Sequence, residues 1–118
     1  MHAFDVLGDP VRRRILELLA EAGQAEWSSG AVTEIIQDEF GITQPAVSQH
    51  LRVLRDNGFA TVRADGTRRL YAVDAAGLRE VDHWLARFRR GDHRHRSRGN
   101  GAGVTEATPG TGRDEDIR

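Results

Sequence analysis

Apolar residues recur at helical spacing in several stretches of the chain, and the stretches are bounded by helix signals. The first predicted helix begins at Asp9 and Pro10, an N-cap followed by proline at the first helical position, and ends before Gly23. A second begins at Ser28 or Ser29 and is broken by Gly41. Their apolar stripes are Val11, Ile15, Leu18 and Leu19 in the first, and Val32, Ile35, Ile36 and Phe40 in the second. A short apolar turn at residues 3–7 precedes both helices.

The third predicted helix has the most regular pattern. Val47, Leu51 and Leu54 recur at i, i+4 and i+7, which places them on one face that can pack on a core. Thr43 is the expected cap, and Asn57 with Gly58 closes the helix. With the preceding helix and the glycine turn at residue 41, the pattern predicts two helices joined by a tight turn.

Extended segments and a last helix follow. Residues 59–63 and 69–73 are rich in strand-forming side chains and flank a loop at residues 64–68, which predicts a β-hairpin. After Asp74 or Ala75 as cap, helical spacing continues to about Arg90. Residues 91–118 are rich in glycine and poor in apolar residues, so we expect one domain over residues 1–90 and a disordered tail.

Length and composition narrow the class of protein. The 118 residues suit one domain, and the absence of cysteine excludes disulfides and thiolate metal sites. No apolar run approaches the roughly 20 residues that span a bilayer, and the N-terminus lacks the features of a signal peptide. We therefore expect a cytoplasmic protein without membrane association. Neither a phosphate-binding glycine loop nor a nucleophile motif is present, so an enzyme and a bound cofactor are not expected.

The net charge of −1 conceals a partition along the chain. Residues 1–40 carry three Arg against eight acids, residues 41–98 carry twelve Arg against six acids, and residues 99–118 carry two Arg against four acids. A basic face can attract phosphates on a protein of neutral average charge, because screening confines the field to roughly 8 Å at physiological salt. The basic segment coincides with the third helix and the hairpin.

The polar face of the third helix carries side chains suited to DNA. Gln and Arg match adenine and guanine edges in the major groove, while Ser and Thr commonly hold phosphates. Taken alone, such a helix is more often a solvated amphipathic helix. The glycine turn before it and the arginine-rich hairpin after it favour a DNA-reading helix instead.

Three segments resemble the ArsR-type family of bacterial repressors: LGDPVRRRILELL, QPAVSQHLRVLRDNGF and DGTRRLYAVD. The resemblance covers about Phe4 to Arg90. It implies a mainly α fold with a small β-hairpin wing, a winged helix-turn-helix, and a dimer formed by the N- and C-terminal helices. It also implies a repressor that binds an operator in double-stranded DNA and releases it when a metal or another signal arrives.

On this interpretation, the predicted DNA contacts come from the third helix and the wing. The N-terminal half of a recognition helix faces base edges, so Gln44, Ser48 and Gln49 are the first choices for reading. The full set is Thr43, Gln44, Ser48, Gln49, His50, Arg52, Arg63, Arg68 and Arg69. Two members have an alternative role: His50 as a hydrogen bonder between helices, and Arg63 as the partner of an acid. Arg12, Arg13 and Arg14 spread around their helix, so one or two of them are expected to reach phosphate and the others to pair with acids such as Glu17.

The predicted dimer interface is apolar. The stripe on the terminal helix is broader than one small domain needs, and the short N-terminal segment adds two apolar side chains. The set is Phe4, Leu7, Leu78, Val81, Trp84, Leu85 and Phe88. The alternative is that these residues only cover the core of a monomer.

A metal site is not predicted. The weak candidates are Asp82, His83, His93 and His95, whose oxygen and nitrogen atoms suit zinc or nickel. Adjacent Asp82 and His83 diverge on a helix, and the other two lie in the predicted tail. The family members that the chain resembles lack recognisable metal ligands, so its inducer is not identified. The rival functions are a protein-interaction module and a metal-responsive repressor.

Overall fold

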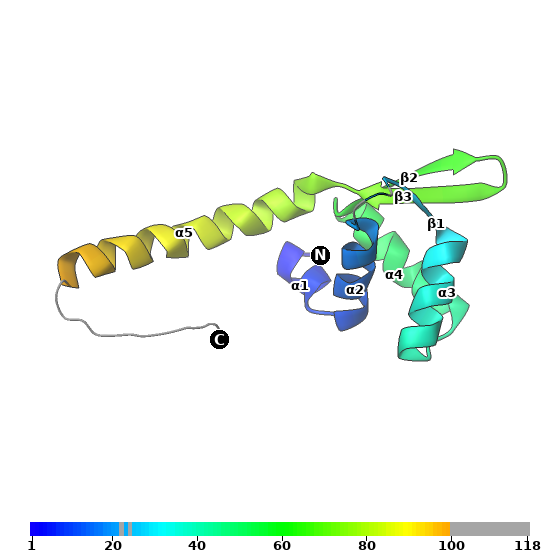
Figure 1. The fold of residues 1–118 in the computed structure, drawn as a ribbon, viewed down its shortest axis with the longest axis horizontal. Helices are drawn as coiled ribbons and strands as arrows, with labels where there is room; N and C mark the ends of the chain where they lie inside the picture. Colours follow the sequence, from blue (N-terminus) through cyan, green and yellow to red (C-terminus); the bar gives the residue numbers. More distant parts are fainter. Residues whose placement is uncertain (22, 24, 100–118) are drawn as a thin grey trace. The chain divides into compact units, whose positions relative to one another are not determined.

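The computed structural model describes residues 1–21, 23 and 25–99. The chain divides into a first part, Met1–Asp82, and a second part that begins at His83. The elements, labelled in Figure 1, are α1 (Ala3–Leu7), α2 (Pro10–Leu19), β1 (Trp27–Ser28), α3 (Ser29–Phe40), α4 (Gln44–Asp56), β2 (Ala60–Asp65), β3 (Arg68–Val73) and α5 (Ala75–Gly99). No helix in the described ranges combines the length and apolarity needed to cross a membrane.

Side-chain caps begin the helices where the sequence predicts them. The Asp9 carboxylate accepts a hydrogen bond from the backbone N–H of Val11 at 2.8 Å. Ser28, rather than Ser29, caps α3. The Thr43 hydroxyl oxygen accepts from the backbone N–H of Ala46 at 3.3 Å. Each cap satisfies a backbone donor that the first turn of a helix leaves without a partner.

A left-handed glycine makes the turn between α3 and α4. Gly41 has φ 66°, and its N–H donates to the carbonyl of Gln37 at 2.9 Å. The Gln37 side-chain amide also donates to the carbonyl of Ile42 at 3.3 Å, which fixes the far side of the turn. The chain therefore reverses within three residues and sets α4 beside α3, as in a helix-turn-helix.

The predicted apolar stripe of α4 lies in the core. Val47, Leu51 and Leu54 are all buried, and they pack with Ile15 of α2 and Ile36 of α3. Burying such side chains contributes roughly 1.5 to 3 kcal/mol each relative to exposure. The burial of this face turns the remaining polar side chains of α4 away from the core.

The hairpin is tighter than predicted, and it belongs to a sheet of three strands. Asp65 is opposite Arg68, so only residues 66 and 67 form the turn, and the predicted loop at residues 64–68 is wrong. Gly66 has φ 64°, which allows a two-residue turn and lets pairing continue to the tip. The sheet order is β1-β3-β2, with Trp27 of β1 opposite Tyr71. The sequence carries no signal for β1, because two residues are too few to show an alternating pattern.

The first turn of α5 docks closely on the end of α4. Asp74 accepts from the N–H of Ala76 at 3.0 Å, as expected for a cap, and the N–H of Gly77 donates to the Gly58 carbonyl at 2.7 Å. A Cβ atom on Gly77 would lie 2.7 Å from ring carbons of Phe59. Only glycine, which has no Cβ, fits at position 77 without a shift of the Phe59 ring.

The first and last helices of the described residues are longer than predicted. The N-terminal turn is helix α1, capped by His2, whose Nδ1 accepts from the N–H of Phe4 at 3.2 Å. The helix α5 continues to Gly99, so its predicted end near Arg90 is wrong. A single glycine within a helix costs only about 1 kcal/mol relative to alanine. Gly91 accordingly does not end α5. The rest of the predicted tail, residues 100–118, lies outside the described residues.

Candidate nucleic-acid interface

The polar face of α4 points away from the core. Thr43, Gln44, Gln49 and Arg52 are exposed, and Ser48 is half-buried. Their side chains interact in two pairs along the helix. The Gln44 amide nitrogen lies 3.2 Å from the Ser48 hydroxyl oxygen, and the Arg52 guanidinium donates to the Gln49 amide oxygen at 2.7 Å. Residues 44–55 contain no acid, so this face presents donors and acceptors without negative charge.

The tip of the hairpin carries two exposed arginines. Arg68 forms an ion pair with Asp65 across the turn, with 3.1 Å between nitrogen and oxygen. Arg69 is opposite Ala64 in the ladder and has no ion-pair partner within the described part of the chain. An exposed ion pair contributes little free energy, so a phosphate can compete with Asp65 for Arg68.

Arg63 is set back from the tip, opposite Leu70. Its Nε and NH2 atoms donate to the two carboxylate oxygens of Glu26 at 2.7 and 2.8 Å. This bidentate hydrogen bond from Arg63 holds the pKa of the Glu26 carboxyl below its ordinary value. Since β3 lies between β1 and β2, the pair links the chain just before β1 to the outer strand of the sheet. The geometry favours the alternative role of Arg63 as the partner of an acid.

Glu26 carries no signal in the sequence that would pair it with Arg63. A single acid in a loop has no periodicity, and its partner is 37 positions away. Only the three-stranded sheet brings the two side chains together, and β1 was itself not predicted.

Arg12 is held inside the protein, with a side chain only 13% exposed. Its Nε donates to the Val6 carbonyl at 2.8 Å, and its NH2 donates to the Asp5 carbonyl at 2.9 Å. These two carbonyls lie in α1, whose five residues leave most of their carbonyls without helical partners. Arg12 therefore fastens α1 to α2.

The other two arginines of this cluster are also engaged. Arg13 donates to the Leu7 carbonyl at 2.6 Å, and Arg14 donates to both carboxylate oxygens of Glu39 at 2.8 and 3.0 Å. The hydrogen bond from Arg14 lowers the pKa of the Glu39 carboxyl. Glu17, the acid expected from the sequence, is 3.8 Å from Arg14. All three arginines thus have partners within the protein, which weakens the expectation that one or two of them reach phosphate.

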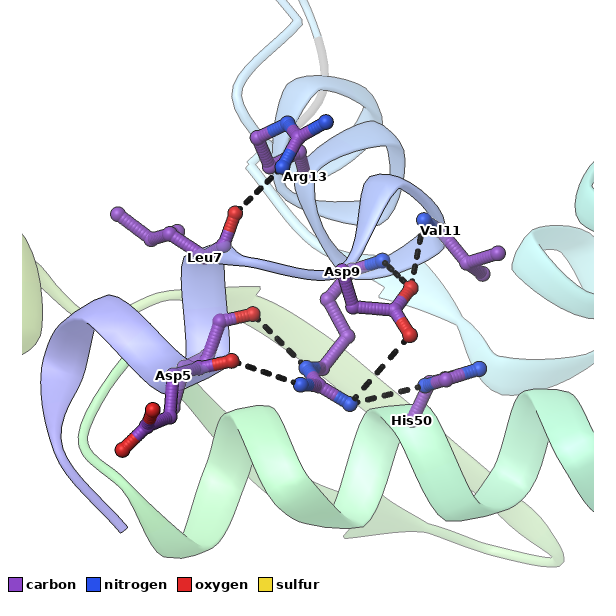
Figure 2. Close-up of polar contacts among 8 residues, drawn as sticks. Asp5, Leu7, Asp9, Val11, Arg13 and His50 are labelled. Atoms are coloured by element: carbon purple, nitrogen blue, oxygen red, sulfur yellow. Dashed lines mark hydrogen bonds and ion pairs between the residues drawn. The ribbon is translucent and has the colours of Figure 1, made fainter.

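His50 of α4 faces the junction of α1 and α2. In Figure 2 a dashed line joins its ring to the guanidinium that lies beside Asp9. Its Nδ1 lies 3.4 Å from NH1 of Arg12, and the residue is half-buried. This position favours the alternative in which His50 is a hydrogen bonder between helices.

The residues of the predicted dimer interface differ in exposure. Leu7 and Val81 are partly buried against the core, whereas Phe4 and Leu78 are exposed. In the second part of the chain the exposed fractions are 38% for Trp84, 42% for Leu85 and 58% for Phe88. The rings of Trp84 and Phe88 meet edge to face at 4.5 Å between centroids. The second part therefore presents apolar side chains that its own packing leaves uncovered.

The described residues contain no group of three or more His, Cys, Asp or Glu placed to hold a metal ion. Asp82 and His83 are adjacent and exposed on α5. The side chains of His93 and His95 lie outside the described residues.

Comparisons with known proteins agree with this architecture. A family model described as a helix-turn-helix domain matches residues 7–63, which run from the end of α1 into β2. The HTH-type transcriptional regulator Rv2034 of Mycobacterium tuberculosis is 40% identical over 86 residues, which cover 73% of this chain and 74% of that protein. A crystal structure described as a possible transcriptional regulator for arsenical resistance is 32% identical, with TM-score 0.62 over 75% of this chain and 84% of that chain.

The chain belongs to the ArsR-type family of winged helix-turn-helix transcriptional regulators. Transcriptional repressor SdpR of Bacillus subtilis is also similar, at 27% identity over 74% of this chain and 89% of that protein. Membership gives α3 and α4 the roles of helix-turn-helix, and it gives β2 and β3 the role of the wing. The protein is therefore a transcriptional regulator with a DNA-binding domain.

Proposed function

We propose that this ArsR-type protein is a homodimeric repressor of an inverted-repeat operator. In this proposal α4 enters the major groove, and the β2–β3 wing lies against the backbone or minor groove. The observation that carries it is the exposed, acid-free face of α4, because a winged helix that had lost DNA binding is expected to accumulate acids or bulky apolar residues there. Exposed Arg68 and Arg69 on the adjoining wing support the same docking.

The side chains take different roles in this arrangement. Gln44, Ser48 and Gln49 contact bases, while Thr43 and Arg52 make phosphate or supporting contacts. Arg68 and Arg69 contact the backbone. For His50 and Arg63, the partners Arg12 and Glu26 within the protein compete with DNA, so we assign these two residues a secondary part.

We propose that the apolar side chains of α1 and α5 form the dimer interface. Covering Phe4, Leu78, Trp84, Leu85 and Phe88 in a second subunit contributes roughly 1.5 to 3 kcal/mol for each fully buried side chain. A twofold dimer places the two recognition helices one turn of DNA apart, roughly 34–36 Å, and requires an inverted repeat.

Repression is supported by the similarity to SdpR, which is named a transcriptional repressor. We place the protein in the cytoplasm, where operator DNA is accessible. In this proposal, release from DNA follows a small molecule, a protein or only a change in expression level. A metal bound by Asp82 and His83 alone is not part of the proposal, since adjacent helical residues diverge.

The decisive experiment is a gel shift of the purified protein on the intergenic DNA upstream of its own gene. Specific retardation that survives competitor DNA is expected, and added zinc or nickel is expected to leave it unchanged. Release by micromolar metal would favour a metal-responsive repressor. Failure to shift that DNA, or any sequence from a random library, would leave the interaction-module function as the better explanation.

The dimer is tested on the Phe88→Glu variant by analytical ultracentrifugation. We expect the wild-type protein to sediment as a dimer and the variant to shift toward monomer. Arg87→Glu is the matched control, because it adds a negative charge one residue away on the same helix at an exposed polar position. Equal dimer dissociation in both variants would argue against the apolar stripe as the interface.

A further inference from the structure

The two ring nitrogens of His50 have different surroundings. Nδ1 lies 3.4 Å from NH1 of Arg12, as drawn in Figure 2. The same guanidinium donates to the carbonyls of Val6 and Asp5 at 2.8 and 2.9 Å, and these hydrogen bonds hold it beside the ring. The contact with Arg12 therefore engages Nδ1 and leaves Nε2.

This contact also determines which ring nitrogen carries the proton. A guanidinium only donates hydrogen bonds, and a neutral imidazole has one nitrogen that donates and one that accepts through its single lone pair. Since Nδ1 of His50 faces the donors of Arg12, Nδ1 accepts and the proton is on Nε2. Nε2 is then a group that can only donate.

The N–H group at Nε2 is accessible to solvent. Nε2 has no hydrogen-bond partner within the described residues. In that part of the chain, the buried side-chain nitrogen or oxygen atom without a partner is Nε1 of Trp27, so Nε2 of the half-buried His50 is not a buried atom. A donor on a ring that is held at its other nitrogen is thus available to a molecule outside the protein.

The position of His50 on α4 indicates what that molecule is. Gln49 is exposed opposite the buried stripe of α4, and consecutive residues of a helix are about 100° apart, so His50 lies on the flank of the polar face. When a helix lies in the major groove, the middle of its exposed face is opposite base edges, and its flanks are opposite the phosphates that border the groove. Phosphate oxygens are acceptors, which match a group that only donates.

We propose that His50 donates from Nε2 to a phosphate of the operator, and that Arg12 is the positioning residue that orients the ring for this contact. The inference rests on the proposed function, in which α4 lies in the major groove. Arg12 competes with DNA for Nδ1 only, so the contact between helices and the contact with DNA exist together. Because the ring is neutral, His50 adds a hydrogen bond to the interface without adding a cation.

Two substitutions in the full-length protein separate the two ring nitrogens. The amide of asparagine lies at about the position of Nδ1, and the amide of glutamine lies at about the position of Nε2. His50→Asn therefore keeps an acceptor for Arg12 and loses the donor to phosphate, whereas His50→Gln keeps the donor and loses that acceptor. We expect His50→Asn to retain the stability of the wild-type protein in urea and to bind the operator about tenfold more weakly. We expect His50→Gln to be the less stable variant and the tighter binder of the two.

The salt dependence of binding gives a readout that a merely structural role would not move. Affinity is measured by fluorescence anisotropy on an operator selected from a random duplex library, at about pH 8, where an ordinary imidazole is neutral. A neutral donor neutralises no phosphate, so the salt slope of His50→Asn should equal that of the wild-type protein. A slope reduced by about 1 would show that His50 acts as a cation and would overturn the proposal.

The contacted phosphate is identified by replacing single linkages of the operator with uncharged methylphosphonate. We expect a linkage in each half-site whose replacement weakens the wild-type protein and has no further effect on His50→Asn. Arg12→Met should also lose the dependence on this linkage, because its ring is no longer oriented. Arg13→Met is the matched control and should keep it, since Arg13 contacts only the Leu7 carbonyl among the described residues.

Nitrogen-15 NMR of the wild-type His50 ring tests the positioning role without a substitution, so it decides even if Arg12→Met does not fold. We expect a protonated Nε2 and an unprotonated Nδ1, and the reverse would overturn the role of Arg12. Retention of the linkage dependence by a folded Arg12→Met would overturn it as well.

The remaining outcomes separate the inference from the proposed function. Selection of no operator by the wild-type protein would overturn the proposed function, and this inference with it. If an operator is selected but His50→Asn binds it as tightly as the wild-type protein does, the phosphate contact is wrong and the regulator stands. The same conclusion follows if no linkage loses its effect in His50→Asn, or if His50→Gln binds more weakly than His50→Asn.

Discussion

Arg12 of α2 and His50 of α4 lie 3.4 Å apart, NH1 to Nδ1, at the point where three helices meet. Since the guanidinium also donates to the carbonyls of Asp5 and Val6, one side chain contacts α1 and α4 at once. Arginine in this cluster therefore joins helices, although its position in a basic run first indicated phosphate binding.

Replacing Arg12 with methionine should destabilise the protein. The change removes the guanidinium donors from the Asp5 and Val6 carbonyls of α1 and removes the contact with His50. We expect a loss of about 1 to 3 kcal/mol in the free energy of unfolding, measured with urea. Arg13→Met, which removes one exposed hydrogen bond to the Leu7 carbonyl, is the control and should cost less. Equal stabilities of the two variants would contradict the joining role of Arg12.

The wing arginines should differ in their effect on DNA affinity. Arg69→Ala is expected to weaken binding to all sequences and to reduce the salt slope by about 1, because one phosphate contact is lost. Arg63→Ala should change affinity less, since Arg63 is held by Glu26. Fluorescence anisotropy over a range of salt concentrations measures both quantities. A larger loss for Arg63→Ala than for Arg69→Ala would reverse the assignment.

The Glu26–Arg63 pair gives a pH dependence with a definite sign. The pKa of Glu26 is lowered in the folded protein from its ordinary 4.5. A lowered folded pKa contributes stability above the unfolded pKa, and this stability is lost as pH falls through the folded pKa. Glu26→Gln should therefore lower Tm at pH 7, and the difference from wild type should shrink below pH 4.5. The effect should be small because both groups are exposed. A difference that grew toward acid would contradict it.

Gly77→Ala should disturb the joint between α5 and the end of α4. The added methyl would lie 2.7 Å from ring carbons of Phe59, whose side chain is fully buried and has little room to move. We expect a loss of about 1 to 3 kcal/mol in stability by thermal unfolding. Gly30→Ala is the matched control. It lies in a helix, where nothing approaches its added Cβ within 4 Å, and it should be neutral or stabilising.

Local chemistry made the three central helices predictable. Asp9, Thr43 and Gly41 act within a few residues of their own positions, and apolar spacing then assigns each helix its buried face. The exposed face of α4 followed from the same spacing. These signals need no knowledge of the rest of the chain.

The features that were missed depend on distant partners or on geometry that sequence does not encode locally. The strand β1 exists because β3 offers it a free edge, and Arg63 turns to Glu26 only after that sheet has formed. The positive φ of Gly66 shortened the hairpin turn. The continuation of α5 through Gly91 reflects how weakly one glycine opposes a long helix.

The hydrogen bonds and ion pairs of Arg12, Arg13 and Arg14 also affect the distribution of charge that the protein presents to a polyanion. Arg12 is held inward by carbonyls of α1, and Arg13 and Arg14 are engaged by the Leu7 carbonyl and Glu39, while Glu21, Glu34 and Asp38 of the same region stay exposed. The cations of α4 and the wing face solvent. In the proposed docking, the field of a DNA duplex therefore attracts the face formed by α4 and the wing within the last roughly 8 Å of approach. On that proposal, the protein begins to orient on the duplex before any hydrogen bond forms.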